Sequence, residues 1–300
     1  MKQQHVVQEL ASGVYAYLQP DGGWCLNNAG ILTSGGEAAV IDTAATLARA
    51  RTLRETVVGL AGRPPRVVVN THFHGDHTFG NCVFADEALI IAHEGTREQV
   101  LAAGLHLQGL WPDVEWGEVT VTPPNLLYRD HTTLHIGGIL AELIRLGPAH
   151  TSDDTVVWLP EQSVLFTGDL VMSGVTPFCP MGSLSGSLEA IDQLRALGAR
   201  TIVTGHGPVA GPEVFDTAVD YLRWVQRLAA DGLAAGLTPV EVAAETDLGR
   251  FGELLDSERL VPNLYRGYAE AVGAIGDVLD IGEVFGEMIR HHGRLPSCHA

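Results

Sequence analysis

Short apolar runs separated by turn residues make up most of the first two-thirds of the chain. They are rich in β-branched and aromatic residues and are broken by Gly and Asp-Gly, which is typical of strands. The runs cover residues 14–19, 29–34, 38–43, 66–70, 88–92, 139–147, 155–160, 163–169 and 201–205. Apolar residues at helical spacing occupy 47–60 and again 188–197, behind Ser187, which we expect to be an N-cap. This loose alternation of strands and helices predicts a layered α/β structure.

From Pro212 onward the pattern becomes helical. Apolar residues recur at helical spacing between Val214 and Val225, and Pro212 suits a first helical turn. Further on, the sequence TPVEVAAE, which begins at Thr238, has the signature of a capping box. No Ser/Gly linker separates this part from the rest. We therefore expect a core over residues 1–211 and a helical extension over 212–300 that packs on it.

Composition and charge exclude several classes of partner. The chain has 300 residues, of which 46% are hydrophobic, enough for a substantial core. Its 36 acidic and 18 basic residues give a formal charge of −18, which would repel nucleic acid. No apolar run approaches the ~20 residues that span a bilayer, and the first residues lack the apolar segment of a signal peptide. We expect a cytoplasmic protein with no nucleic acid or membrane partner; a homodimer is one option for its oligomeric state.

The four cysteines form no C-x-x-C pair, which suits reduced thiols better than a disulfide framework or a zinc knuckle. Any metal chemistry must therefore use histidine and carboxylate. The stretch NTHFHGDHTFGN gathers His72, His74, Asp76 and His77 directly after an apolar strand. A strand that ends in His-x-His sends both imidazoles to one side, so they can converge on one metal. Asp76 and His77 follow where a helix could begin, and they suit a second metal.

Three residues far along the chain can complete such a site, since a stable metal centre needs further ligands. His150 precedes the strand 155–160, Asp169 ends the strand 163–169, and His206 follows the strand 201–205. Because each lies at a strand end or in the adjoining loop, we expect them to gather along one edge of the structure. The remaining histidines have no companion pattern and are expected to be ordinary surface or core residues: His5, His93, His106, His131, His135, His291, His292 and His299.

The His-x-His-x-Asp-His cluster, the later histidine, the Thr-Gly-Asp strand end and the Gly-His-Gly resemble the metallo-β-lactamase superfamily, from about Val14 to Pro208. The resemblance implies a four-layer αββα sandwich of the α/β (α+β) class, with two metal ions, usually zinc, at one edge. The implied ligands are His72, His74 and His150 for the first ion, Asp76, His77 and His206 for the second, and Asp169 between them.

Two positions of this pattern bear on the branch of the family. A histidine at position 74, where the flavo-diiron branch carries glutamate, favours zinc over iron, with manganese and iron kept as alternatives. An aspartate at position 169, where many β-lactamases place cysteine or serine, argues against antibiotic resistance as the role.

The resemblance also implies a mechanism that needs no Ser or Cys nucleophile. Two divalent ions that share a water can lower its pKa from ~15.7 toward 7, so that a metal-bound hydroxide attacks an ester or thioester. Asp76 would orient this water or carry its proton. Asp42 and Asp154 are candidates to hydrogen-bond the outer nitrogens of ligand histidines, with ordinary strand-end or turn aspartates as the alternative.

Two irregular but apolar segments, 104–119 and 171–187, are candidates for the substrate pocket. They carry Trp111 and Trp116, and Phe178 and Met181. These side chains could form a hydrophobic roof that accepts a flat or greasy acyl group; alternatively, the loops pack on the C-terminal helices.

Residues 14–30, together with the helical tail, resemble the subgroup that contains thioesterase/cyclases of aromatic polyketide pathways. That resemblance implies a small-molecule or acyl-carrier-tethered substrate. A lactonase is weakened by Leu170, Val171 and Met172, because lactonases of the superfamily often carry a tyrosine just after the bridging aspartate. A glyoxalase II-like thioesterase, an iron-dependent oxidoreductase on the same fold and a metal-retaining binding protein stay open.

Overall fold

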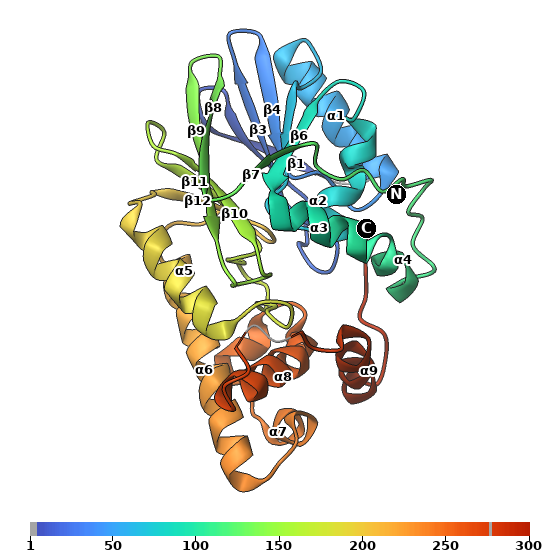
Figure 1. Ribbon diagram of the computed structural model, residues 1–300, viewed down its shortest axis with the longest axis vertical. Helices are drawn as coiled ribbons and strands as arrows, with labels where there is room; N and C mark the ends of the chain where they lie inside the picture. The colour runs from blue at the N-terminus through green and yellow to red at the C-terminus, as the bar shows by residue number, and fades with distance from the viewer. Residues whose placement is uncertain (1–4, 276–277) are drawn as a thin grey trace.

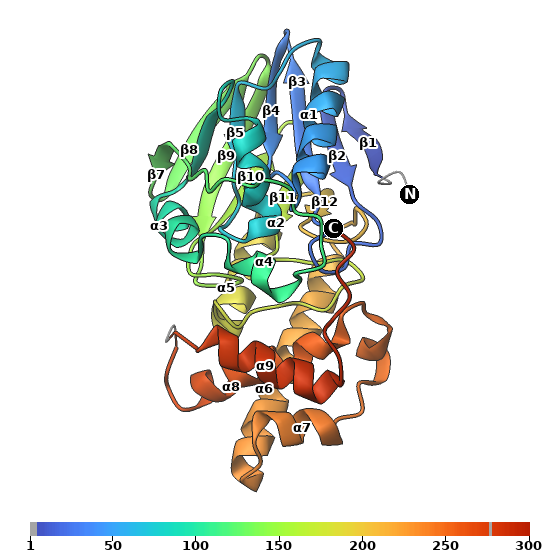
Figure 2. The same ribbon diagram turned by 90° about the vertical axis from the view of Figure 1, so that its right-hand side faces the viewer.

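Two β-sheets pack face to face, and helices cover the outer face of each sheet (Figures 1 and 2). The computed structural model describes residues 5–275 and 278–300. Helix α1 (Leu47–Ala61) lies against the first sheet, and α5 (Leu184–Ala196) covers the second. This is the four-layer αββα sandwich that the resemblance implies.

The first sheet has seven strands in the order β1 to β7. Its first four strands form an antiparallel meander, and the last three add in parallel, with α1 as the crossover between β4 and β5. The bounds are β1 (Val6–Ala11), β2 (Val14–Leu18), β3 (Ala29–Ser34), β4 (Glu37–Ile41), β5 (Val67–Val69), β6 (Leu89–His93) and β7 (Leu126–Tyr128).

The second sheet has five strands in the order β12-β11-β10-β9-β8. Helix α5 connects the parallel pair β11 and β12, while the other neighbours are antiparallel. The bounds are β8 (His131–Ile136), β9 (Ile139–Leu146), β10 (Asp154–Leu159), β11 (Val164–Gly168) and β12 (Thr201–Thr204). Every residue of β10 and β11 is buried, as expected for strands covered on both faces.

The apolar core lies between the two sheets. Its side chains come from alternate positions of both sheets and include Leu32, Ile41 and Val69 on one side and Leu143, Phe166 and Val203 on the other. A second apolar cluster fills the space between the first sheet and α1. A third joins α5 to the second sheet and to the C-terminal helices.

Helix starts follow local capping chemistry, with one correction to the sequence analysis. Ser187 does not cap α5: the cap is Ser183, whose Oγ accepts the N–H of Gly186 at 2.9 Å. Ser187 lies one turn inside the helix and donates to the carbonyl of Ser183 at 2.7 Å. The buried stripe already begins at Leu184, so the helix starts before the residues used to predict it. The capping box of α7 (Pro239–Glu245) is confirmed.

Some elements were not predicted from the sequence. They are β1, β7, β8, α3 (Glu94–Ala103) and the short α4 (His106–Leu110). In β1 and β8 exposed polar side chains interrupt the apolar pattern, which leaves only a weak strand signal.

The C-terminal part is helical, as expected, and packs against the sandwich. It consists of α6 (Val214–Ala235), α7, α8 (Leu260–Ala271) and α9 (Ile281–His292). Helix α8 contacts α5 and α6, and the segment after α9 returns to the core beside α4 (Figure 2). There Trp111 Nε1 donates to the carbonyl of Pro296 at 2.8 Å.

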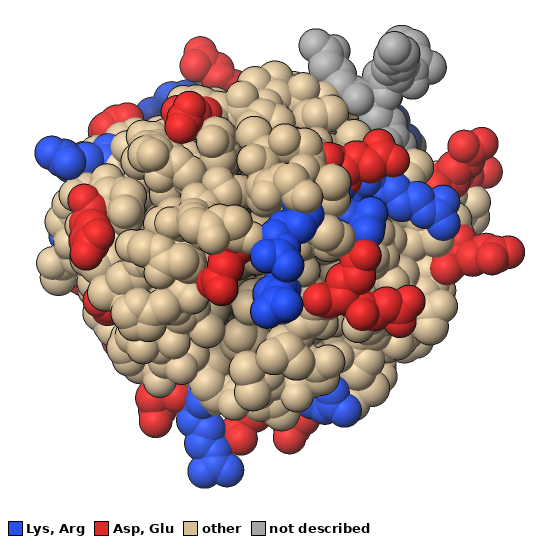
Figure 3. All heavy atoms as spheres, turned by 90° about the horizontal axis from the view of Figure 1, so that it is seen from above, with Lys and Arg blue, Asp and Glu red and all other residues tan. Residues whose placement is uncertain are grey.

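The surface carries charged side chains of both signs. Figure 3 shows basic and acidic side chains interspersed on the face seen from above. Several surface arginines are paired with carboxylates, for example Arg54 with Glu87 at 2.6 Å.

All four cysteines are free thiols. Within residues 5–275 and 278–300, every helix is too short or too polar to cross a bilayer.

The close approach of the two sheets at Gly30 gives a stability prediction. A Cβ on Gly30 would lie 2.6 Å from Phe166 Cε1 and 2.9 Å from Ile41 Cδ1. We expect Gly30→Ala to lower the free energy of unfolding by about 1–3 kcal/mol, because the core between the sheets becomes overpacked. Urea denaturation measures this change.

The matched control is Gly59→Ala on α1, where a Cβ meets nothing within 4 Å. It should raise the free energy of unfolding by about 0.5–1 kcal/mol, because alanine favours the helix. A Gly30→Ala protein as stable as the native chain would contradict the prediction.

Candidate metal centre

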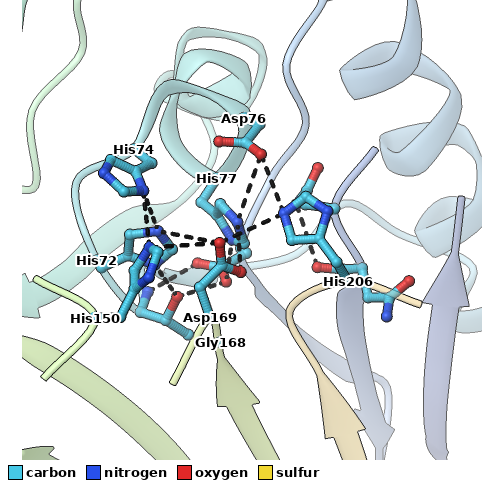
Figure 4. Close-up of polar contacts among 12 residues, drawn as sticks. His72, His74, Asp76, His77, His150, Gly168, Asp169 and His206 are labelled. Carbon is cyan, nitrogen blue, oxygen red and sulfur yellow. Dashed lines mark hydrogen bonds and ion pairs between the residues drawn. The ribbon is translucent and has the colours of Figure 1, made fainter. Parts of the chain in front are cut away.

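The seven residues singled out from the sequence lie together at one edge of the sandwich (Figure 4). His72 and His74 follow β5, and Asp76 and His77 lie on the single turn of α2 (Gly75–Thr78). The other three come from the second sheet. His150 lies in the loop between β9 and β10, Asp169 directly follows β11, and His206 follows β12.

Four of these side chains form a first group, which could hold a metal ion. His74 Nδ1 lies 3.0 Å from His72 Nε2 and 2.9 Å from His150 Nε2. Asp169 Oδ2 lies 3.5 Å from His150 Nε2 and 3.9 Å from His72 Nε2. All ligand atoms of the group lie within 4.8 Å of one another.

Asp76, His77 and His206 form a second group of the same kind. Asp76 Oδ2 lies 3.3 Å from His206 Nε2 and 3.8 Å from His77 Nε2. Asp169 also reaches this group, at 3.2 Å from His77 Nε2 and 3.4 Å from His206 Nε2. Figure 4 shows Asp169 between the two groups, at the place that the resemblance gives to a bridging ligand.

The donor atoms fit metal ions better than they fit one another. His77 Nε2 and Asp169 Oδ1 are both buried and lie 3.2 Å from each other, but among the described residues neither makes a hydrogen bond of normal geometry. Buried polar atoms normally have partners, so these two are suited to a ligand. Imidazole nitrogens and carboxylate oxygens are the donors that zinc takes in proteins.

Burial keeps the histidines of the first group neutral. It lowers the pKa of His74 to about 3, and His150 adds to this effect. It also lowers the pKa of His150 to about 4, against the opposing effect of Asp169. The pKa of His72 falls well below its usual value for the same reason. Neutral imidazoles keep the lone pairs that a metal requires.

The second group favours positive charge. Burial lowers the pKa of His206, but the carboxylates of Asp169 and Asp76 outweigh it and raise the pKa to about 9. Burial raises the pKa of Asp76, but His77 and His206 outweigh it and hold the pKa at about 2. A position that stabilises a buried imidazolium between two carboxylates would also stabilise a divalent ion.

Hydrogen bonds to the outer ring nitrogens orient the histidines of both groups. Asp42 makes one of the two such bonds that the sequence predicts. Asp42 Oδ2 lies 2.8 Å from His77 Nδ1, and the same carboxylate accepts the N–H and the hydroxyl of Thr71 at 2.8 and 2.7 Å. Asp154 contacts no ligand histidine. Its carboxylate accepts the N–H and hydroxyl of Thr151 at 2.9 and 2.8 Å, the local turn geometry that a short acidic side chain favours.

Two outer partners were missed because they are backbone carbonyls. His150 Nδ1 lies 2.5 Å from the carbonyl oxygen of Phe178. His206 Nδ1 lies 2.9 Å from that of Gly22. Every residue has a carbonyl group, so no sequence signal identifies these two.

A cavity of about 490 Å³ opens over the two groups. Of the four predicted pocket residues, Phe178 and Met181 line it. Further apolar side chains that line the cavity come from the whole length of the chain: Trp24, Phe73, Phe79, Leu107, Met172 and Phe285. Trp24 belongs to the segment 14–30, and Phe285 belongs to α9.

Trp111 and Trp116 lie outside the cavity lining, which corrects the expectation for segment 104–119. Both are buried, and each indole N–H has a nearby acceptor. Trp111 donates to the carbonyl of Pro296, and Trp116 donates to the carbonyl of Trp111 at 3.0 Å. Trp111 thus holds the segment after α9 against this loop, while Trp116 bonds within the loop itself.

The cavity wall contains one buried arginine that the sequence analysis did not place there. Arg259 is buried, and its guanidinium lies 4.1 Å from the ring centroid of Trp24. It is paired with Asp256 at 2.9 Å, so its charge is compensated. Arg259 is the only arginine or lysine among the described lining residues. The wall is therefore apolar in character.

Comparisons with known proteins agree with the family resemblance. The model of the family described as "Metallo-beta-lactamase superfamily" matches residues 22–206. A metallo-beta-lactamase from Pontibacter korlensis has a similar structure, with a TM-score of 0.60 and 23% identity, and the match covers 73% of this chain and 99% of that one.

Curated relatives are distant. A linear primary-alkylsulfatase of a Pseudomonas species is 23% identical over 254 residues, which is 70% of this chain but only 48% of the relative. A type 2 metallo-beta-lactamase of Bacteroides fragilis is 25% identical over 222 residues, 70% of this chain and 82% of that protein. A hydroxyacylglutathione hydrolase of Methylococcus capsulatus is 25% identical over 138 residues, 45% of each chain. With its family model matched over more than half of its length, the chain belongs to the metallo-β-lactamase superfamily.

Proposed function

We propose that this protein is a binuclear, zinc-dependent hydrolase that cleaves an ester or a thioester. The observation that carries the proposal is the pair of buried His/Asp groups beneath an apolar cavity. In this proposal His72, His74 and His150 hold the first ion. Asp76, His77 and His206 would hold the second, and Asp169 lies within reach of both groups. Manganese or iron could use the same donors.

Two divalent ions at these positions would supply Lewis acidity, polarising a carbonyl oxygen and lowering the pKa of water toward 7. The chain's own contribution is orientation. Asp42 fixes the ring of His77, and the Phe178 carbonyl fixes that of His150. Asp76 lines the cavity, and one of its oxygens points away from His77 and His206 (Figure 4). That oxygen can accept a hydrogen bond from a water molecule and so orient it toward the substrate.

The cavity wall supports an apolar, flat acyl group as the preferred substrate. Aromatic and aliphatic side chains surround the space, and the charge of Arg259 is already paired. The specific form of the proposal is a thioesterase/cyclase that acts on a carrier-bound aromatic polyketide. It is supported by the resemblance of residues 14–30, since Trp24 and Cys25 of this segment line the cavity.

A second candidate is the hydrolysis of primary alkyl sulfate esters. One relative is named as an alkylsulfatase, and an apolar cavity of this size can accept an alkyl chain. A lactonase and a hydroxyacylglutathione hydrolase-like thioesterase are further alternatives of the same class. The alternative of another class is an iron-dependent oxidoreductase on the same fold. All of these candidates would use the same two metal positions. The hydrolases differ from one another in substrate, and the oxidoreductase differs in the reaction.

The first prediction concerns metal and substrate together. Elemental analysis of the purified protein should find two transition-metal ions per chain, mainly zinc, and chelation should abolish hydrolysis. In a panel of thioesters, lactones, alkyl sulfates and phosphoesters, aromatic thioesters should give the highest kcat/KM. Metal-free protein with full activity would contradict the proposal; zinc with alkyl sulfate turnover would favour the second candidate.

The second prediction tests the support beneath the second ion. Asp42→Asn should weaken the binding of one ion by about 10–100-fold, because His77 loses its anionic partner. Competition with a chromogenic chelator measures both affinities. Asp153→Asn is the control, since Asp153 pairs with Arg145 and contacts no proposed ligand. Equal effects of the two substitutions would argue against a specific role of Asp42.

The third prediction concerns the cavity wall. Phe285→Ala should raise KM for an aromatic thioester about 10-fold and change kcat little, because the lost contact binds ground state and transition state alike. Phe251→Ala is the control: Phe251 is buried against Tyr221 and Trp224, away from the cavity. Both variants should lose about 3–5 kcal/mol of stability. A KM that rises equally in both would contradict the assignment of the wall.

A further inference from the structure

One face of α8 donates hydrogen bonds to the loop between β11 and α5. Arg259, Asn263 and Arg266 stand at i, i+4 and i+7, so they share this face. Arg259 Nη1 donates to the carbonyl of Thr176 at 3.1 Å, and Arg266 Nη2 to that of Pro180 at 2.7 Å. Between them, Asn263 holds the loop on both sides of Phe178.

We propose that Asn263, a residue of the C-terminal extension, is a positioning residue for the metal ligand His150. Asn263 is fully buried. Its Oδ1 accepts the N–H of Cys179 at 2.8 Å, and its Nδ2 donates to the carbonyl of Pro177 at 2.7 Å. The residue between these two, Phe178, offers its carbonyl to His150 Nδ1 at 2.5 Å. The inference rests on the metal centre of the proposed function.

The loop depends on such side-chain bonds for its position. Residues 176–180 belong to no helix or regular strand, and two of them, Pro177 and Pro180, have no N–H to donate. The carbonyls of Thr176, Pro177 and Pro180 all accept from α8 instead. With the peptide units on both sides held, the carbonyl of Phe178 has a fixed direction.

The direction of this carbonyl determines which ring nitrogen of His150 carries the proton. A carbonyl oxygen only accepts, so Nδ1 of His150 must carry the proton and Nε2 is left with its lone pair. This lone pair faces the first group, where His150 Nε2 lies 2.9 Å from His74 Nδ1. Asn263 thus acts on the metal position through one intervening residue, and it is not itself a ligand.

Asn263→Ala tests the inference by removing both bonds that flank Phe178. Competition of Zn²⁺ with a chromogenic chelator, supported by the absorption spectrum of the Co²⁺-loaded protein, should show one ion bound about 10–100-fold more weakly. The other ion should keep its native affinity. Asn263→Asp keeps the side-chain volume and the acceptor for Cys179 but not the donor for Pro177. If the alanine variant folds poorly, this variant should still show a smaller loss of affinity for the same ion.

Two controls separate positioning from general loosening of α8. Tyr221→Phe removes the other group that Asn263 Nδ2 contacts, at 3.1 Å, and leaves the loop bonds in place. Glu270→Gln weakens the attachment of α8 to α5, where Glu270 accepts from Leu184 and Ser185. Both should bind two ions as the native protein does, even where thermal stability falls.

The outcomes distinguish this inference from the proposed function. If the native chain binds no metal, the proposed function fails and this inference fails with it. If the native chain binds two ions and the Asn263 variants bind both as tightly, only the positioning role is refuted. Equal loss of affinity in Glu270→Gln and Asn263→Ala would also refute it, because a merely structural role predicts that result.

Discussion

The candidate metal centre requires seven ionisable side chains, all buried except the half-buried His74, to lie together at one edge of the sandwich. An uncompensated buried carboxylate costs several kcal/mol, so opposite charge must stand close to it. His77 and His206 face both Asp76 and Asp169, and Asp42 supports His77 from beneath. These contacts join strand ends of both sheets. The centre therefore exists only when the sheets pack face to face, and the inter-sheet core is a condition of the chemistry.

This dependence explains what the sequence could predict. The proposed ligands in the second sheet stand next to strands that are buried and mainly apolar, which give a strong signal. The parallel strands β11 and β12 end at the same edge of the sheet. The convergence of His72, Asp169 and His206 follows from that topology. Strands with exposed faces, such as β1 and β8, gave no such signal. The start of α5 was misplaced because Ser183 and Ser187 both look like caps, and only packing of Leu184 decides between them.

The rest of the site depends on contacts that local sequence does not encode. The carbonyls of Gly22 and Phe178 support ligand histidines, yet a carbonyl belongs to every residue. Trp111 looked like a pocket residue because aromatic loops often line cavities, but a buried indole needs an acceptor and finds it 185 residues away at Pro296. Phe285 lines the cavity because α9 packs beside the cavity. No pattern in the first two hundred residues predicts this placement.

Phe178 takes part in both the cavity and the support of His150. The ring of Phe178 lines the cavity, while its carbonyl supports His150. Because Asn263 holds the backbone on each side of Phe178, the ring can change its rotamer while the carbonyl keeps its direction. Phe285 of α9 packs against the ring of Phe178, with 5.7 Å between the ring centroids. A change in α9 therefore acts first on the rings that line the cavity, whereas the support of His150 depends on the backbone bonds that Asn263 makes.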